Sequence, residues 1–286
     1  MNPHLYSILS ASIEFCHKFE KDYYTFLKTA GFKQRNRKSR LELAEILTIQ
    51  IYFHFSGYSN FKTYYKYYAL KEFQDCFFLV KYSQFNKLSN ETPFLLDLFL
   101  KSRLDNTSQY YFIDATCLPL CNKKRVHSHK VFFKEASLGY STIHGMFFGF
   151  KLHLIVNHDG EIANYALSTA KHHDVKYLVP LAKDLNGKLC GDKGYISDVA
   201  QKKLAQQQLK LITHNRKNML TQNIFYGVEK KMLRHRGIIE SVFNKLKNVL
   251  RMGTHKSRSV TGFMAHCFSA LLAYTFDKRK PSVRLP

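Results

Sequence analysis

Short apolar runs alternate with helical stretches from about residue 108 onward, and this alternation constrains the fold most. The runs at 110–118 and 145–156 are rich in β-forming residues. An Asp-Gly turn at 159–160 joins the second run to a third, which predicts a β-hairpin. The pattern then predicts helices at 174–185, 197–208 and 238–250, with short strands at 188–190 and 209–213. This order predicts an α/β fold, in which helices flank a mixed sheet.

The first hundred residues lack this alternation and predict an all-helical module. Apolar residues between 4 and 29 recur at helical spacing, and a basic link over 33–40 precedes a second expected helix at 41–55, with Ser39 as its N-cap. The stretch 60–73 interleaves aromatic residues with lysines, which fits either a nucleic-acid face or a Tyr-rich helix packed on its neighbours.

Length and pattern together predict two domains. We expect a helical module over residues 1–104 and an α/β domain over residues 105–286. The apolar stretch 263–276 is expected to form a buried helix near the end of the second domain.

The chain carries a strong positive charge. It contains 44 Lys and Arg residues against 21 Asp and Glu residues, which gives a formal net charge of +23. A charge of this size favours a polyanionic partner such as nucleic acid, with an anionic membrane surface as the alternative. The sequence has no apolar stretch of transmembrane length and no signal peptide, so we expect a cytoplasmic protein with no membrane partner.

Cations gather in two segments. The loop 122–134 contains five cations and no acid, and we interpret its Lys123, Lys124 and Arg125 as a strip that contacts the DNA backbone; a solvated loop is the alternative. The segment 210–258 contains only two acids, Glu229 and Glu240. Its cations are Lys210, Arg216, Lys217, Lys230, Lys231, Arg234, Arg236, Lys245, Lys247, Arg251, Lys256 and Arg258.

Three acids occupy positions suited to phosphoryl transfer. Asp114 lies within the first expected strand, Asp192 directly follows the strand at 188–190, and Glu240 lies on the helix at 238–250. Carboxylates that converge from a strand, a strand end and a helix can hold two Mg²⁺ ions, which prefer oxygen ligands. Gly191 and Gly194 flank Asp192 and predict a sharp turn there.

The helix that carries Glu240 has two interpretations. On a regular helix Arg236 and Lys247 share the face of Glu240, so a metal-binding carboxylate would lie between phosphate-binding cations. An ordinary exposed helix with i,i+4 salt pairs is the alternative. The expected apolar stripe of this helix consists of Val242, Leu246 and Val249.

Four stretches of the chain combine into one pattern. They are Ile113-Asp114-Ala115-Thr116 with Pro119 and Cys121 following, the run from Phe147 to His153, the run Gly191-Asp192-Lys193-Gly194-Tyr195, and Arg236 through Glu240 to Lys247. Together these stretches resemble insertion-sequence DDE transposases. The third matches the Asp-x-Gly-aromatic motif of that family. The fourth matches its Tyr-x₂-Arg-x₃-Glu-x₆-Lys signature, except that Leu233 stands in place of the Tyr.

This resemblance implies an RNase H-like catalytic domain and a function in DNA transposition. The implied reactions are metal-dependent cleavage at transposon ends and strand transfer to target DNA. The implied catalytic and metal-binding residues are Asp114, Asp192 and Glu240, with two Mg²⁺ (or Mn²⁺) ions. The implied DNA contacts are Arg236, Lys247, Lys193 and Tyr195.

The resemblance also implies partners and a location. The partner would be double-stranded DNA, as transposon inverted repeats and target DNA, bound by a homodimer or higher oligomer in the bacterial cytoplasm. The N-terminal helices resemble the helix-turn-helix-like DNA-binding module of many transposases.

Two other functions remain open. One is an RNase H-like nuclease, such as a resolvase, that cuts without joining; the spacing of Arg236, Glu240 and Lys247 argues against it. The other is a transposase-derived DNA-binding protein without catalysis, against which the presence of all three acids argues.

Two smaller groups also invite a functional interpretation. Soft ligands suggest a zinc site, but we favour reduced, buried thiols for a cytosolic chain. The side chains concerned are Cys117, Cys121, His127 and His129. His173 could orient water and Asp174 could act as an extra metal ligand, but we favour Asp174 as an N-cap of the helix expected at 174–185.

Overall fold

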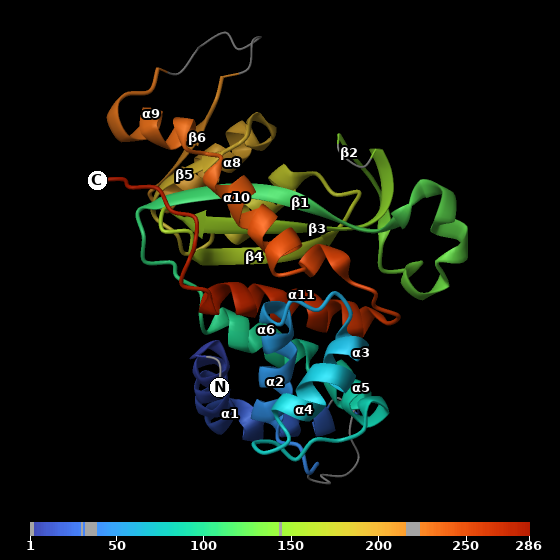
Figure 1. The fold of residues 1–286 in the computed structure, drawn as a ribbon. Helices are drawn as coiled ribbons and strands as arrows, with labels where there is room; N and C mark the ends of the chain where they lie inside the picture. The colour runs from blue at the N-terminus through green and yellow to red at the C-terminus, as the bar shows by residue number, and fades with distance from the viewer. Residues whose placement is uncertain (1–2, 30, 32–38, 143–144, 216–223) are drawn as a thin grey trace. The chain divides into compact units, whose positions relative to one another are not determined.

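The computed structural model describes residues 3–29, 31, 39–142, 145–215 and 224–286, which form two compact units. The helical unit consists of Met1–Arg103 and Leu246–Lys278, and the α/β unit consists of Leu104–Lys245 and Arg279–Pro286. Figure 1 labels the elements of both units. None of the helices in the described ranges is both long and apolar enough to cross a membrane.

The helical unit starts with a long helix at the predicted place. This helix, α1, runs over Pro3–Thr29, and Gly31 then adopts a positive φ of 74°. The amide of Gly31 donates to the carbonyl oxygen of Lys28 at 3.1 Å, so glycine closes the C-terminus as expected. The other α-helices of the unit are α2 (Leu43–Tyr52), α3 (Phe61–Tyr64), α4 (Leu70–Glu72), α5 (Tyr82–Asn90), α6 (Pro93–Lys101) and α11 (Val260–Phe276).

The start of α2 differs from the prediction. The N-cap is Glu42 rather than Ser39, and a capping box joins Glu42 to Glu45, whose Oε2 accepts from the Glu42 amide at 2.7 Å. The Ser39 hydroxyl instead accepts from the amide of Leu41 at 3.3 Å. Most of the basic link at 33–40 lies outside the described residues.

The aromatic stretch at 60–73 forms a helix with an irregular middle. Asn60 caps α3, a π-helical turn spans Tyr65–Ala69, and α4 follows. Tyr64 and Tyr65 are completely buried, and the Tyr65 ring lies 4.4 Å from the Phe85 ring. For these two tyrosines the structure supports the packed alternative.

The C-terminal helix α11 belongs to the helical unit, although we expected it in the α/β domain. It is apolar on every side, and twelve of its 17 residues are buried. It contacts α2, α5 and α6. Ser259 caps it by accepting from the Gly262 amide at 3.0 Å. A helix that is apolar all round must be enclosed by other elements, and these three helices supply contacts of that kind.

The α/β unit contains a six-stranded mixed sheet, which confirms the prediction of an α/β fold with a mixed sheet. The main path of the sheet is β2-β3-β1-β5-β6, and β4 also pairs with β3. β3 is antiparallel to β1, β2 and β4, whereas β1, β5 and β6 are mutually parallel. The strands are β1 (Tyr110–Asn122), β2 (Ser137–Ser141), β3 (Gly145–Asn157), β4 (Ile162–Thr169), β5 (Gly187–Gly191) and β6 (Leu209–Thr213).

Helices pack on this sheet. The α-helices of the unit are α7 (Leu178–Leu181), α8 (Asp198–Gln206), α9 (Gly227–Arg234) and α10 (Ile238–Asn244). Tyr111 and Ile113 of β1 join buried residues of α7 and α8 in one core cluster. Successive side chains alternate across a strand, so Asp114 points to the opposite face from Ile113. α10 contacts β1, the strand that carries Asp114.

Several predicted elements differ in detail. The helix expected at 174–185 is a 3₁₀ turn (Asp174–Tyr177) followed by the short α7, and the loop at 122–134 contains two 3₁₀ turns. The helix expected at 238–250 is α-helical only to Asn244 and continues as a π-helical turn over Lys245–Val249. Val249 was predicted to belong to its apolar stripe but is 60% exposed, because a π-turn changes the angular spacing of the side chains that follow.

Candidate active site

The pairing of β1 with β5 brings two predicted acids to one edge of the sheet. The parallel register pairs Tyr110 with Lys188 and Phe112 with Cys190. Carrying that register two residues further sets Asp114 opposite Asp192, which directly follows the last residue of β5. Adjacent strands lie about 4.8 Å apart, so the two carboxylates belong to one neighbourhood.

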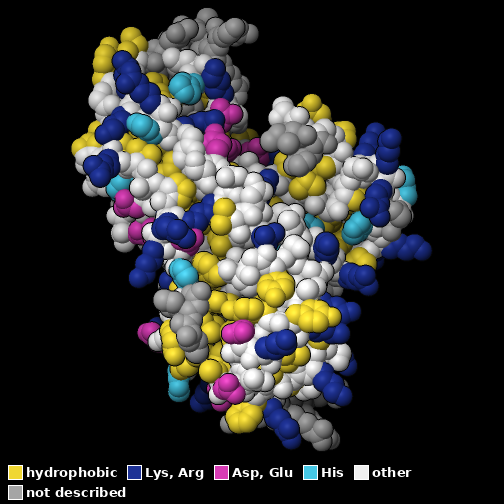
Figure 2. All heavy atoms as spheres, viewed as in Figure 1, with side chains coloured by type: hydrophobic (Ala, Val, Ile, Leu, Met, Phe, Trp, Pro, Cys, Tyr) yellow, Lys and Arg dark blue, Asp and Glu magenta, His cyan; other side chains and the backbone are white. Residues whose placement is uncertain are grey.

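The third acid comes from α10 and reaches the same neighbourhood through Arg236. The Arg236 Nη2 atom donates to Glu240 Oε1 at 2.8 Å, and its Nη1 atom lies 3.6 Å from Asp192 Oδ1. Glu240 lies in the first turn of α10, four residues after Arg236. A single guanidinium therefore bridges two of the three predicted acids. Figure 2 shows a small group of acidic side chains on a face over which Lys and Arg side chains are scattered.

The charges of the three acids interact. Burial, with added repulsion from Glu240 and Asp192, raises the pKa of Asp114 from 3.8 to about 6. The amide of Ala115 and the charge of Arg236 act in the opposite direction on this pKa. An acid held under such repulsion gains stability from any cation that enters between the carboxylates.

Tyr195, which we expected to contact DNA, has a buried side chain close to these acids. Its side chain is 2% exposed, and within the described residues its hydroxyl has no hydrogen-bond partner. Burial raises the pKa of Tyr195, and the charges of Asp114, Asp174 and Asp192 raise it further. The ring supports the edge of the sheet from inside, so little of it is available to DNA.

The donor set fits a hard divalent cation, although the acids are not assembled as ligands. Among the described residues no three His, Cys, Asp or Glu side chains form a group that could hold a metal ion as they stand. The three acids therefore do not form a preassembled metal site in this structure. The same holds for the zinc alternative at Cys117, Cys121, His127 and His129. The acids nevertheless offer only oxygen donors, which suit Mg²⁺ or Mn²⁺. The raised pKa of Asp114 and the orphaned Tyr195 hydroxyl mark an environment that a bound cation would stabilise.

Asp174 does not cap a helix, which contradicts our preferred interpretation. The N-cap of the turn is His173, and Asp174 Oδ1 instead accepts from Lys151 Nζ at 2.9 Å. Lys151 also donates to the carbonyl oxygen of His172 at 3.0 Å. This pairing joins β3 to the turn after β4, and sequence spacing contains no signal for it. The bridging position of Arg236, in contrast, follows from its i,i+4 spacing to Glu240.

The remaining predicted DNA contacts are placed as follows. Lys193 is exposed beside Asp192, and Lys123, Lys124 and Arg125 are exposed in the 3₁₀ turn that follows β1. Lys247 lies in the π-helical turn and belongs to the helical unit, so its position relative to the three acids stays a prediction. Arg216 and Lys217 lie outside the described residues.

Comparison with known proteins gives one family and one structural neighbour. Residues 104–260 match a family described as transposase DDE domain. A cryo-EM structure of a piggyBac transposase synaptic complex with hairpin DNA matches at 13% identity and a TM-score of 0.40. The match covers 75% of this chain and 49% of the other, so the chain spans about half the length of that transposase. No curated protein matches.

Proposed function

Because the chain belongs to the transposase family with a DDE domain, we propose that it cleaves DNA at the ends of a mobile element and joins the freed ends to target DNA. The observation that carries this proposal is the placement of Asp114, Asp192 and Glu240. Asp114 lies on a central strand, Asp192 follows the end of the parallel neighbouring strand, and Glu240 lies on a helix packed on the strand of Asp114. The charges of Glu240 and Asp192 both raise the pKa of Asp114.

The strand order supports an RNase H-like sheet. Without β2, the order is β4-β3-β1-β5-β6, with β3 antiparallel to its neighbours and the last three strands parallel. In such a sheet Asp114 lies on the central strand, and β2 is an additional strand that pairs with the first half of β3.

Asp114, Asp192 and Glu240 would hold Mg²⁺ or Mn²⁺, two ions in the full site. When bound, these ions activate the attacking oxygen and stabilise the leaving oxygen of a phosphodiester. The protein's own residues prepare the site. Arg236 balances the charge of Asp192 and Glu240 in the absence of DNA, and Asp114 lies where water is largely excluded, so that its carboxylate interacts strongly with a cation.

Cations around the acids would hold the DNA. Lys193 and Arg236 lie next to the carboxylates, and Lys123, Lys124 and Arg125 extend the positive surface beyond the end of β1. With a net charge of +23, the chain suits double-stranded DNA as a partner. Terminal inverted repeats and target DNA are the proposed substrates, bound by a homodimer or larger assembly in the bacterial cytoplasm, with the helical unit as a second DNA-binding module.

A strand-transfer assay tests this function. Duplexes that end in the inverted repeats flanking the gene are incubated with target plasmid and Mg²⁺, and cut and joined products are measured. Asp114→Asn, Asp192→Asn and Glu240→Gln should each abolish both products, because each removes a charge that holds the cation. Asp198→Asn changes an exposed acid on α8 and should leave both products unchanged.

The two other functions predict different products. A resolvase-like nuclease would give cut DNA without joined DNA, and a catalytically silent protein would give neither while still binding the duplex. Near-normal products from Glu240→Gln would contradict the assignment of the three acids.

A further inference from the structure

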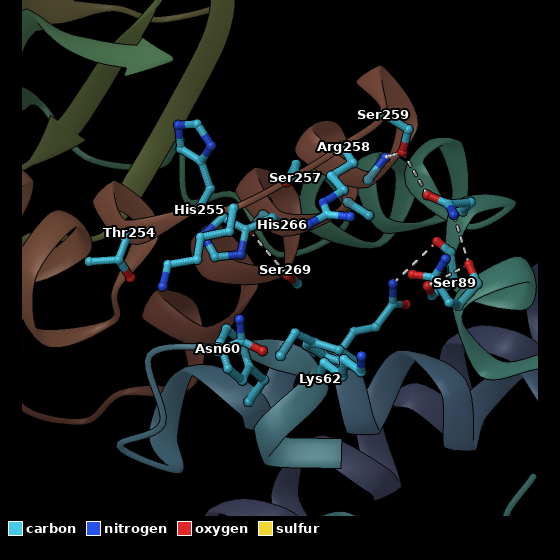
Figure 3. Close-up of a pocket in the computed structure, with 18 of the residues that line it drawn as sticks. Asn60, Lys62, Ser89, Thr254, His255, Ser257, Arg258, Ser259, His266 and Ser269 are labelled. Carbon is cyan, nitrogen blue, oxygen red and sulfur yellow. Dashed lines mark hydrogen bonds between the residues drawn. The ribbon is translucent and has the colours of Figure 1, made fainter. Parts of the chain in front are cut away.

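A pocket of about 570 Å³ lies within the helical unit, away from the three acids in sequence. Its walls come from α3 and α5 on one side and from the segment 254–259, which leads into α11, on the other. Figure 3 shows Asn60 and Lys62 on one wall, with His255 and Arg258 on the wall that faces them. Both walls belong to one compact unit, so the pocket is a property of that unit alone.

The chemistry of the pocket is cationic and polar. Lys62, Lys256 and Arg258 line it, and no Asp or Glu is among the described residues that do so. Within the described part of the chain, none of these three cations forms an ion pair. Hydroxyl and amide groups also line the pocket, including Asn60, Asn86, Ser257 and Ser259, and the rings of Phe53, Phe61 and Tyr82 contribute to its walls. Three unneutralised cations around one pocket indicate a place for an anion.

Buried contacts hold the wall that carries Lys256 and Arg258. His54 is 3% exposed, and its ring bonds the Leu250 carbonyl at 2.6 Å and the Ser269 hydroxyl at 2.9 Å. At the other end of the segment, the Ser259 hydroxyl donates to Asn90 Oδ1 at 3.1 Å. The His54 contact holds the chain at Leu250, shortly before the segment 254–259, and the Ser259 contact holds the last residue of the segment, so this wall is fixed without a ligand.

We propose that this pocket binds the phosphodiester backbone of double-stranded DNA, as a second DNA contact outside the catalytic acids. The inference rests on the proposed function in taking DNA as the substrate. Phosphate contacts in protein–DNA complexes come from Lys, Arg, Ser and Asn side chains and from helix N-termini. The pocket offers all of these, because the first turn of the 17-residue α11 also lines it.

The form of the pocket favours DNA over a small phosphate compound. Pockets for small ligands are mostly apolar and enclose most of the ligand. Here Lys62, Lys256 and Arg258 are all exposed, so a long polyanion can reach them from the surface while one nucleotide unit occupies the interior. The volume exceeds what a single phosphate group needs and suits a backbone segment with its sugars.

Binding of a short duplex to the full chain, without Mg²⁺ so that the DNA stays intact, tests the proposal. The variant Lys62→Gln/Lys256→Gln/Arg258→Gln should weaken binding about 10- to 100-fold at low salt. The slope of log affinity against log salt should decrease by up to about 2.7, since each phosphate contact contributes about 0.9. The segment 254–259 should also gain amide-exchange protection when wild-type protein binds DNA.

A matched variant controls for net charge. Lys18→Gln/Lys21→Gln/Lys28→Gln also removes three exposed cations of the helical unit, but none of them lines the pocket. It should reduce affinity less than about threefold. Equal losses in both variants, or an unchanged salt slope in the pocket variant, would overturn the proposal. Displacement of the duplex by micromolar inorganic phosphate or dAMP would also overturn it, by indicating a small-molecule site.

Cleavage measured on the same DNA separates this inference from the proposed function. If wild-type protein cleaves with Mg²⁺ but the pocket variant binds like wild type, the pocket proposal fails and the function stands. If binding depends on the pocket but no condition gives cleavage, the function fails and the pocket remains a DNA site.

Discussion

Asp114 has the least favourable surroundings of the three acids. It lies on a central strand, largely buried, and Glu240 and Asp192 repel its charge. Its carboxylate accepts from the amide of Ala115 at 2.8 Å, which offsets only part of this cost because the pKa still rises to about 6. The ionised carboxylate of Asp114 destabilises the free protein. A cation bound between the acids would reduce the repulsion, so part of this cost would favour cation binding.

The raised pKa of Asp114 predicts how stability depends on pH. The folded state holds this proton up to about pH 6, whereas an ordinary Asp has a pKa of 3.8. The protonated carboxyl therefore makes its full contribution to the free energy of unfolding below pH 3.8, and this contribution is lost as the pH rises through 6. Asp114→Asn should raise the free energy of unfolding at pH 7.5 by on the order of 1–3 kcal/mol, and by much less at pH 4.

Urea unfolding at the two pH values measures this difference. Asp198→Asn is the control, because that acid is exposed on α8 and should give nearly the same small change at both values. A gain for Asp114→Asn that is equal at pH 4 and pH 7.5 would show that charge is not its cause.

Arg236 predicts a second effect at this scale. Its guanidinium is held between Asp192 and Glu240, both about half exposed, so Arg236→Gln should cost only about 0–1 kcal/mol of stability. Without that charge the acids repel more, and Mg²⁺ should raise the melting temperature more than it does in wild type. Thermal unfolding with and without Mg²⁺ measures this, and an equal rise in both proteins would contradict it.

The sequence predicts the acids better than it predicts their neighbours. The strand and helix positions of the three acids suggest them only weakly, and the resemblance to DDE transposases makes them the candidates; the spacing of Arg236 to Glu240 indicates the pairing of these two residues. Burial of Tyr195 and the pairing of Asp174 with Lys151 depend on how separate elements pack, so no local pattern contains them.

At the scale of elements, the register between β1 and β5 sets the distance between Asp114 and Asp192. The ladder begins where the Lys188 amide donates to the Gln109 carbonyl oxygen at 2.8 Å. Gly187, just before it, has a φ of 97°, and a Cβ there would lie 2.4 Å from that same carbonyl oxygen. Glycine is therefore required at the start of β5, for both conformation and space.

Gly187→Ala should destabilise the protein by on the order of 2–4 kcal/mol and disturb the β1–β5 register. Cleavage should fall with it, because the two acids would no longer be opposite one another. Gly194→Ala is the matched control. We expected Gly194 to be needed for a sharp turn, but its φ is not positive and a Cβ there would meet no atom within 4 Å among the described residues.

Chemical denaturation and the cleavage assay measure both effects together. Tolerance of Gly187→Ala with normal stability would contradict the role given to the register. A loss in Gly194→Ala as large as in Gly187→Ala would contradict the distinction between the two glycines.

The two π-helical turns could not be predicted from the spacing of apolar residues. The stretch 238–250 was expected to be a single regular helix, and a Tyr-rich helix was one of the two interpretations of the stretch 60–73. Each contains a π-turn, at Tyr65–Ala69 and Lys245–Val249. A π-turn adds one residue to a helical turn, which hardly changes the amino-acid composition of the stretch. It does rotate the side chains that follow, and this explains why Val249 is exposed.

At the scale of the whole molecule, the helical unit is assembled from two distant parts of the chain. Residues up to Arg103 and residues from Leu246 onward form it together, and the sheet-forming segment lies between them in sequence. The apolar character of α11 predicts that this helix is buried, but it contains no information about which elements enclose it. The predicted domain boundary at residue 104 therefore accounts for the point where the chain leaves the helical unit, but not for its return to that unit at Leu246.

This discontinuity predicts how fragments behave. A fragment of residues 1–103 lacks α11 and would expose the surfaces of α2, α5 and α6 that α11 contacts. Each large apolar side chain left in water costs about 1.5–3 kcal/mol, and α11 contributes Phe263, Leu271 and Leu272 among its buried residues. The fragment alone should therefore aggregate or unfold without a cooperative transition, whereas residues 1–103 joined to 246–278 by a flexible linker should unfold cooperatively.

Circular dichroism melts of the two fragments test this, with Leu271→Asn in the linked fragment as the control, since Leu271 is completely buried. The substitution should remove most of the benefit of the added helix, because it places an amide among apolar neighbours. Cooperative unfolding of residues 1–103 alone, at a temperature close to that of the linked fragment, would show that α11 is not part of the unit's core.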